Sequence, residues 1–299
     1  MRKIVLSFFV ALLVLLAGLC LVDSKFYASF VEQYLISSAR YNNIRLALED
    51  TRLSGLGLIA PKVELFLSKY LLSLELTELK LKLSPVDLFF LSPVVSFSAE
   101  SYNGEISGRL KSSLLKVQTG LELNLSNLDL SLHPQLQGFG ISSGGLNATL
   151  TNFNTNSDGI QAGLISLNVS KLNKPQESSF YLPVSGLPMK ISIPNFNDLS
   201  MSIALRFVPK TCYVEAFTSN SSLAVISGQG VLTTAKSHTW KIEDMEIIVN
   251  LSDTGLKFAG LYLPLVSAGR LSATSKDFSV RISRQGHNQK ATFKLLYSK

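Results

Sequence analysis

Carboxylates and histidines are the side chains in this sequence that could carry acid–base chemistry. Glu243 and Asp244 are adjacent in a stretch that alternates like a β-strand, so we expect them to face opposite sides and not to share a substrate. The remaining acids of interest lie beside predicted turns, where a short acceptor bonds the local backbone. These are Asp87, Asp129, Asp198 and Asp253.

Histidine, cysteine and glycine form no recognisable site in the sequence. His133, His238 and His287 are far apart on polar or turn-like stretches, and we expect ordinary surface positions for them. Cys20 and Cys212 are too few and too distant for a disulfide framework or a metal site. Glycine pairs occur without the further residues of a dinucleotide site, a P-loop or a nucleophile elbow. We therefore predict no enzyme activity, no catalytic, cofactor-binding or metal-binding residues, and no cofactor.

Composition narrows the class of partner. The 299 residues are 46% hydrophobic and only 16% charged, with a net charge of +7. A nucleic-acid-binding protein would gather its Lys and Arg in a stripe with interleaved aromatic residues. Here the basic residues are scattered, which argues against nucleic acid. A basic excess beside a hydrophobic segment suits the surface of an anionic membrane better.

The N-terminal segment is typical of a membrane anchor. Residues 4–22 are apolar and would form a helix roughly 28 Å long, close to the hydrocarbon thickness of a bilayer. Arg2 and Lys3 precede this run and favour a cytoplasmic N-terminus. Leu19 stands where a lipoprotein or a cleaved signal peptide has a small residue. We predict an uncleaved transmembrane anchor over residues 1–24, a juxtamembrane helix or linker over 25–45, and a β-rich periplasmic domain over 46–299; a signal peptide is the alternative.

The rest of the chain alternates between apolar and polar residues, which is typical of strands with one wet face. In residues 73–84 and 120–132 the alternating leucines change parity, at Thr77-Glu78 and at Ser126-Asn127, so a β-bulge or a bend is expected at each slip. Asn103-Gly104 predicts a two-residue hairpin turn. About fourteen strands and no amphipathic helix are expected beyond residue 50. The predicted fold is mainly β: an extended, curved antiparallel sheet, meandering or trough-like, with one N-terminal transmembrane helix. A two-layer sandwich is the alternative.

One stretch resembles a known family. In "LSPVVSFSAESYNGEISGRL", residues 91–110, the residues Leu91, Pro93, Phe97, Gly104 and Gly108 resemble the type II secretion system protein N (GspN) family, which is similar to the AsmA-like proteins of bacteria with two membranes. The order of the other segments agrees across most of the chain, from the N-terminal anchor to "GLELNLSNLDL", "GGLNATL" and "LPLVSAGRLSATSKDFSVRI".

The resemblance implies a single-pass protein of the bacterial inner membrane with its bulk in the periplasm. Its function would be that of an accessory or scaffold of a type II secretion system, and its partners would be the inner membrane and other secretion-system components. AsmA-like proteins imply the alternative, a lipid-binding or lipid-transfer protein with an apolar β-groove and phospholipid as a partner. The family offers no catalytic residues, and Gly104 and Gly108 are interpreted as turn and bulge positions.

The two interpretations differ in what should cover the apolar face. A scaffold should have its alternating leucines packed by protein, whereas a lipid carrier should leave a continuous apolar surface open. A secreted or outer-membrane β protein is a third interpretation, and it requires cleavage of the N-terminal segment.

Overall fold

The structure is a computed structural model that describes residues 29, 32–33, 36–37, 40, 44–54, 57–67, 72–84, 86–87, 92–113, 118–184, 187–234, 240–260, 262–285 and 288–296. The predicted membrane anchor, Cys20, His238 and His287 lie outside these residues. Within the described part of the chain, no helix has the length and hydrophobicity needed to cross a bilayer. The described residues between 29 and 40 are helical, and the Ser37 hydroxyl donates to the Gln33 carbonyl at 2.7 Å.

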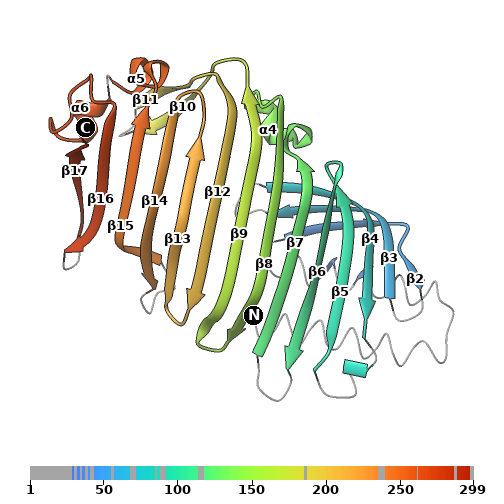
Figure 1. Cartoon of the computed structure of the whole chain (residues 1–299). Coiled ribbons are helices and arrows are strands. Elements are labelled where there is room, and N and C mark those ends of the chain that lie inside the picture. The colour runs from blue at the N-terminus through green and yellow to red at the C-terminus, as the bar shows by residue number, and fades with distance from the viewer. Residues whose placement is uncertain are drawn as a thin grey trace. The chain divides into compact units, whose positions relative to one another are not determined.

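The chain is mainly β, as predicted, and its strands form one large antiparallel sheet and a separate two-stranded sheet (Figure 1). The hydrogen-bonded order in the large sheet is β1-β3-β4-β5-β6-β7-β8-β9-β12-β13-β14-β15-β16-β17, with β2 paired to β3. Consecutive strands are therefore neighbours, as in a meander, except that β10 and β11 pair only with each other.

The chain divides into two compact units, and β8 and β9 contribute residues to both. Unit 1 comprises residues 1–128 and 150–161, and unit 2 comprises residues 129–149 and 162–299. Apart from parts of β8 and β9, the strands of unit 1 are β1 (Ile44–Glu49), β2 (Arg52–Ser54), β3 (Gly57–Leu67), β4 (Leu72–Leu83), β5 (Val94–Ser101), β6 (Gly104–Ser113) and β7 (Gln118–Asp129).

Unit 2 holds the remaining strands and the short helices. Its elements are η1 (Leu130–Leu132), α4 (Pro134–Gly138), β8 (Ser143–Asn156), β9 (Gly159–Lys174), β10 (Ser178–Val184), β11 (Leu187–Ile193), β12 (Phe196–Val208), β13 (Thr211–Asn220), β14 (Ala224–Thr234), β15 (Trp240–Leu251), α5 (Asp253–Ala259), α6 (Leu263–Val266), β16 (Asp277–Gln285) and β17 (Asn288–Leu295).

Both predicted parity slips coincide with irregular backbone. Thr77 pairs with Glu100 and Lys80 with Ser98, so β4 carries one residue more than β5 and Glu78 takes a φ of 54°. This is the expected β-bulge, because the extra residue restores the leucines to one face. At the second slip Asn127 takes a φ of 56°.

The glycines of the 91–110 motif serve other purposes than predicted. The hairpin turn consists of Tyr102 and Asn103, both with positive φ, and Gly104 is already the first residue of β6. A Cβ at Gly104 would lie 2.4 Å from the Ser126 carbonyl oxygen. Gly108 is not a bulge: it pairs in register with Phe97, whose ring would lie 2.5 Å from an added Cβ. Close packing, not turn geometry, requires glycine at both positions.

The sequence predicted no amphipathic helix after residue 50, but short helices occur in the β7–β8 and β15–β16 connections, and residues 86 and 87 are helical as well. The alternation through Leu128, Leu130 and Leu132 predicts a continuing strand, yet Leu130–Leu132 is the 3₁₀ helix η1 and α4 follows it. The Asp129 carboxylate accepts from the Ser131 amide at 2.9 Å and from its hydroxyl at 2.6 Å, which begins the 3₁₀ turn. The second connection, between β15 and β16, contains α5 and α6.

Candidate apolar ligand surface

The strand register of unit 2 places four rows of uncharged side chains on one face of the sheet. One row runs through paired residues of β9 and β12–β17: Leu167, Ile203, Phe217, Gly228, Ile247, Val280 and Phe293. The second row contains Val169, Met201, Ser219, Ile226, Val249, Phe278 and Leu295. The third row contains Ile165, Leu205, Val214, Gly230, Met245, Ile282 and Ala291. The fourth row contains Gly163, Phe207, Cys212, Leu232 and Ile242. We call these four rows the apolar face.

The bulges of unit 2 keep this face free of charge. The extra residues in β12, β13 and β15 are Asp198, Glu215 and Glu243, which register shifts identify against the neighbouring strands. Each extra residue changes the parity of its strand, so the apolar positions before and after the bulge share one face. The charged residue itself is exposed in all three cases.

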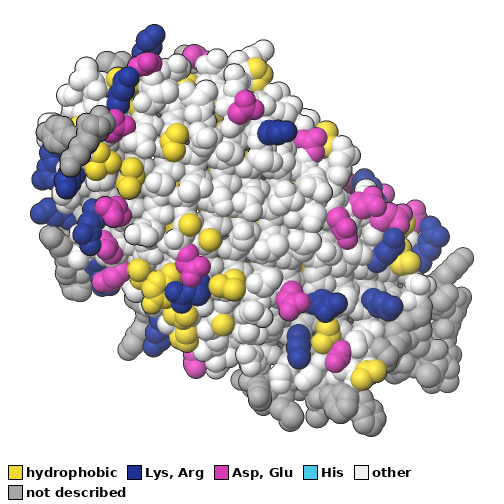
Figure 2. Space-filling view, viewed as in Figure 1, with side chains coloured by type: hydrophobic (Ala, Val, Ile, Leu, Met, Phe, Trp, Pro, Cys, Tyr) yellow, Lys and Arg dark blue, Asp and Glu magenta, His cyan; other side chains and the backbone are white. Residues whose placement is uncertain are grey.

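The opposite face of unit 2, which we call the polar face, exposes polar side chains together with the apolar side chains Leu164, Val225 and Ile248. Ser202, Thr218, Gln229 and Asn250 are exposed there. In the space-filling view, viewed as in Figure 1, uncharged polar side chains and backbone predominate over hydrophobic side chains (Figure 2).

Most side chains of the apolar face are half-buried. Its buried members are Gly163, Val169, Cys212 and Phe278. Among the described residues of unit 2, the elements that pack closely on one another are neighbouring strands, α5 with β15, and η1 with α4. Among the described strands, only β10 and β11 lie outside the large sheet, and they pair with each other.

The two ends of the apolar face differ. At one end Leu263 and Leu271 pack with Phe278 in a cluster that includes Val249 and Val280. Toward the other end the rings of Phe207 and Trp240 meet edge to face, with centroids 5.9 Å apart. The face between these ends follows strands such as β15, whose twelve residues extend for roughly 40 Å at about 3.3 Å per residue. One bilayer leaflet is only about 15 Å thick in its hydrocarbon part, so an acyl chain could lie along the strands.

Unit 1 has an apolar face of the same construction, which is a buried core in part, whereas Leu121, Leu123 and Leu125 of β7 are half-buried. In one of its rows, Leu48 of β1 pairs with Val63 of β3, which pairs with Leu76 of β4. Val63 is 1% exposed and Leu58 2% exposed. Leu83, Val95, Ala99 and Ile106 are buried as well.

Glu243 and Asp244 lie on the same face, contrary to the prediction. Glu243 is the bulge residue of β15, and both carboxylate side chains are 46% exposed. They bind different partners: Asp244 lies 2.9 Å from the Arg281 guanidinium, and Glu243 lies 3.3 Å from that of Arg284. The hydrogen bond from Arg281 lowers the pKa of Asp244, so this carboxyl is ionised at neutral pH and does not serve as a general acid.

Histidine and cysteine form no site with these acids. His133 is buried at the N-terminus of α4, which corrects the expected surface position. Cys212 is a free, buried thiol on the apolar face, and burial raises its pKa. No group of three or more His, Cys, Asp or Glu among the described residues could hold a metal ion. The four rows contain no charged side chain, so they can bind a ligand only by hydrophobic and dispersion contacts, and Arg284 borders them as the next residue of the same parity in β16.

Sequence reasoning found the alternating strands but named no residue of this face as a binding site. The signal was present in the repeated apolar alternation of 196–208, 211–220 and 240–251, which the structure aligns in register. No protein family, curated protein or solved structure matches the chain significantly. Membership of the type II secretion system protein N family therefore stays a prediction.

Proposed function

We propose that this chain is a non-enzymatic lipid-binding protein that carries acyl chains on the apolar face of unit 2. The observation that supports this proposal is the continuous, uncharged and half-buried character of that face across β9 and β12–β17. An apolar surface that stays in contact with water is unfavourable. Contiguous apolar patches on monomers accordingly rarely exceed about 300–600 Å².

The expected affinity is moderate. Each methylene that is fully removed from water contributes about 0.8 kcal/mol, so half-covering a chain of about twelve methylenes yields roughly 5 kcal/mol. This is close to the reversible membrane binding of a single acyl chain. A protein of this affinity could take up and release lipid, as a carrier must.

The proposal includes a cellular location and a membrane topology. Residues 1–24 would anchor the chain in the bacterial inner membrane with the described residues in the periplasm, and the sheet would curve into a trough around phospholipid. The anchor-like hydropathy of residues 4–22 and the scattered positive charge support this setting.

Lipid extraction followed by native mass spectrometry of the full-length chain, purified from membranes in mild detergent, tests the proposal. Ile203→Asp places a carboxylate on the apolar face, while Ser202→Asp places one on the exposed polar face at the next residue of β12. We expect stoichiometric phospholipid with the unchanged chain and with Ser202→Asp, and a loss of at least fivefold with Ile203→Asp. Equal lipid content in all three proteins would refute the proposal, since lipid held by the anchor alone would not respond to residue 203.

A second proposal is that the chain is an accessory of a type II secretion system that recruits other components by strand addition. One observation supports it: β17 is the last strand in the hydrogen-bonded order, so one of its edges is open to pairing among the described residues. A photo-crosslinking residue at Thr292 in β17, with one at Asn168 in β9 as the control, tests it in membranes. Crosslinks to a secretion-system component from 292 and not from 168 are expected, and their absence would count against the proposal.

A further inference from the structure

We infer that the α5–α6 end of unit 2 docks on the surface of an anionic lipid bilayer. This inference rests on the proposed function, because a carrier must reach a membrane to exchange its lipid. It adds the part of the protein that makes the contact, which is residues 252–276 together with the η1–α4 connection. We call this region the docking end.

Large aromatic side chains are exposed at the docking end. Phe258 is 37% exposed and Tyr262 53% exposed, and their ring centroids are 6.2 Å apart. Phe139, which follows α4, is 50% exposed. The helix α4 lies in the β7–β8 connection, and α5 and α6 lie in the β15–β16 connection. Both connections are at the same end of the antiparallel strands, where Figure 1 shows the three helices. Tyrosine, with its polar hydroxyl, favours the membrane–water interface, and phenylalanine is common on the apolar side of segments that lie in that interface.

The charge around these aromatic residues suits an anionic surface. Residues 252–276 contain Lys257, Arg270 and Lys276 against Asp253 alone, so the segment carries a net charge of +2 (three minus one). Lys276 binds Asp253 at 2.5 Å, whereas Lys257 and Arg270 are exposed with no acidic side chain within ion-pair distance among the described residues. Each basic residue near an anionic membrane contributes about 1 kcal/mol of attraction.

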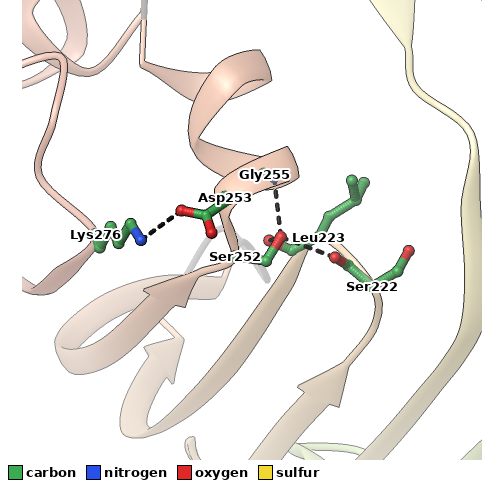
Figure 3. Close-up of polar contacts among 6 residues, drawn as sticks. All are labelled: Ser222, Leu223, Ser252, Asp253, Gly255 and Lys276. Atoms are coloured by element: carbon green, nitrogen blue, oxygen red, sulfur yellow. Dashed lines mark hydrogen bonds and ion pairs between the residues drawn. The ribbon is translucent and has the colours of Figure 1, made fainter.

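The helix α5, which carries Phe258, is fixed to the sheet (Figure 3). The Ser252 hydroxyl accepts from the Gly255 amide at 3.0 Å and lies 2.8 Å from the Ser222 carbonyl oxygen, to which it can donate. The Ser252 amide donates to the Leu223 carbonyl at 2.9 Å. A Cβ at Gly255 would lie 1.9 Å from the Leu223 carbonyl oxygen, so only glycine allows α5 to approach the β13–β14 turn this closely.

The docking end is continuous with the apolar face. Leu256 of α5 and Leu263 of α6 pack against Phe278, while Phe258 points to solvent from the same helix. The cluster also includes Val249, Val280, Phe293 and Leu295, which belong to the apolar face. A lipid that leaves a bilayer at Phe258 and Tyr262 would therefore meet apolar side chains all the way onto the sheet.

An environment-sensitive fluorophore tests the contact directly. In a background of Cys20→Ser and Cys212→Ala, Phe258→Cys and the control Gln229→Cys are labelled with nitrobenzoxadiazole, and the full chain is reconstituted into vesicles of phosphatidylethanolamine and phosphatidylglycerol. Gln229 is exposed on the polar face of β14, away from both ends. Nitroxide-bearing lipids should quench the label at 258 at least twofold and leave the label at 229 unchanged. Equal quenching at the two positions, or none at 258, would overturn the inference.

A second variant separates docking from lipid binding. Phe258→Ser combined with Tyr262→Ser changes no residue of the apolar face, so we expect unchanged phospholipid stoichiometry and an at least fivefold slower transfer of fluorescent lipid to acceptor vesicles. An unchanged transfer rate would contradict docking at this end. If quenching at 258 is found while no lipid co-purifies, docking stands and the lipid-carrier proposal fails.

Discussion

Unit 1 and unit 2 use the same strand pattern and bury it to different extents. In unit 1, Val63 and Leu58 are 1% and 2% exposed, at the centre of the apolar rows. In unit 2, the corresponding central residues Ile203, Phe217 and Ile247 are all half-buried. An alternating pattern thus decides which side chains share a face, but it does not decide what covers that face.

The difference in burial between the two apolar faces suggests different roles for them, one in stability and the other in binding. A buried apolar face contributes to stability because its side chains are removed from water in the folded protein. A half-buried face has hydrophobic free energy still to gain, which a ligand can supply. We therefore assign the core to unit 1 and the ligand surface to unit 2, and the following predictions test that division.

The largest effect is expected from a charge in the core of unit 1. Val63→Asp buries a carboxylate without a partner, which should destabilise unit 1 by about 3–5 kcal/mol. Hydrogen exchange of the β3 and β4 amides in the full chain measures this as faster exchange. The exposed neighbour Glu64→Gln is the control, and a change under about 1 kcal/mol for Val63→Asp would mean that this face is not a core.

The same kind of change in unit 2 should be milder for folding and severe for binding. Leu205 is half-buried, so the carboxylate of Leu205→Asp retains water and should cost about 1–2 kcal/mol. Hydrogen exchange in β12 and β13 reports that cost, while co-purified phospholipid should fall at least fivefold. Leu205→Met preserves the apolar surface and should keep both properties. Global unfolding by Leu205→Asp would place this residue in a core and contradict the division.

Substitution at the α5 contact tests whether the docking end is fixed to unit 2. Gly255→Ala adds a methyl group 1.9 Å from the Leu223 carbonyl oxygen, so α5 must move away. Overpacking of this kind costs about 1–3 kcal/mol. Faster hydrogen exchange in α5 is expected, with little change in β9 and β12. The exposed neighbour Thr254→Ala should behave like the unchanged chain; identical exchange in both variants would show that α5 is not held by this contact.

The smallest effect concerns an ion pair on the polar face. The Arg281 guanidinium lowers the pKa of Asp244 in the folded state, so the pair stabilises the protein above the unfolded pKa of about 3.9. That contribution is lost as pH falls through the lowered folded pKa. Because the Asp244 side chain is 46% exposed, the effect should stay under about 1 kcal/mol. Asp244→Asn should reduce stability at pH 7 and cease to matter near pH 2; a pH-independent difference would argue against the ion pair.

The sequence predicted the β class, the alternating faces and the bulge at Glu78, because these follow from local periodicity. It did not predict that Glu243 and Asp244 share a face, because the bulge is visible only when Val231 and Leu232 of β14 are aligned with β15. Nor did it predict α5, although Ser252 before Asp253 and a later Lys257 form an N-cap, first-turn and last-turn pattern that indicates a helix. The strand pattern does not encode how deeply the apolar face is buried, because that depends on which other elements pack on it.

The most direct test of the lipid surface uses the single tryptophan of the chain. Trp240 begins β15 and contacts Phe207 on the apolar face, in the part of unit 2 farthest along the strands from α5. The full chain is reconstituted into vesicles whose phospholipids carry brominated acyl chains, and its emission is compared with that in unbrominated vesicles. If acyl chains occupy the apolar face, bromine should quench Trp240 by about half, and Leu205→Asp should restore the emission. Equal emission in both kinds of vesicle would contradict the account.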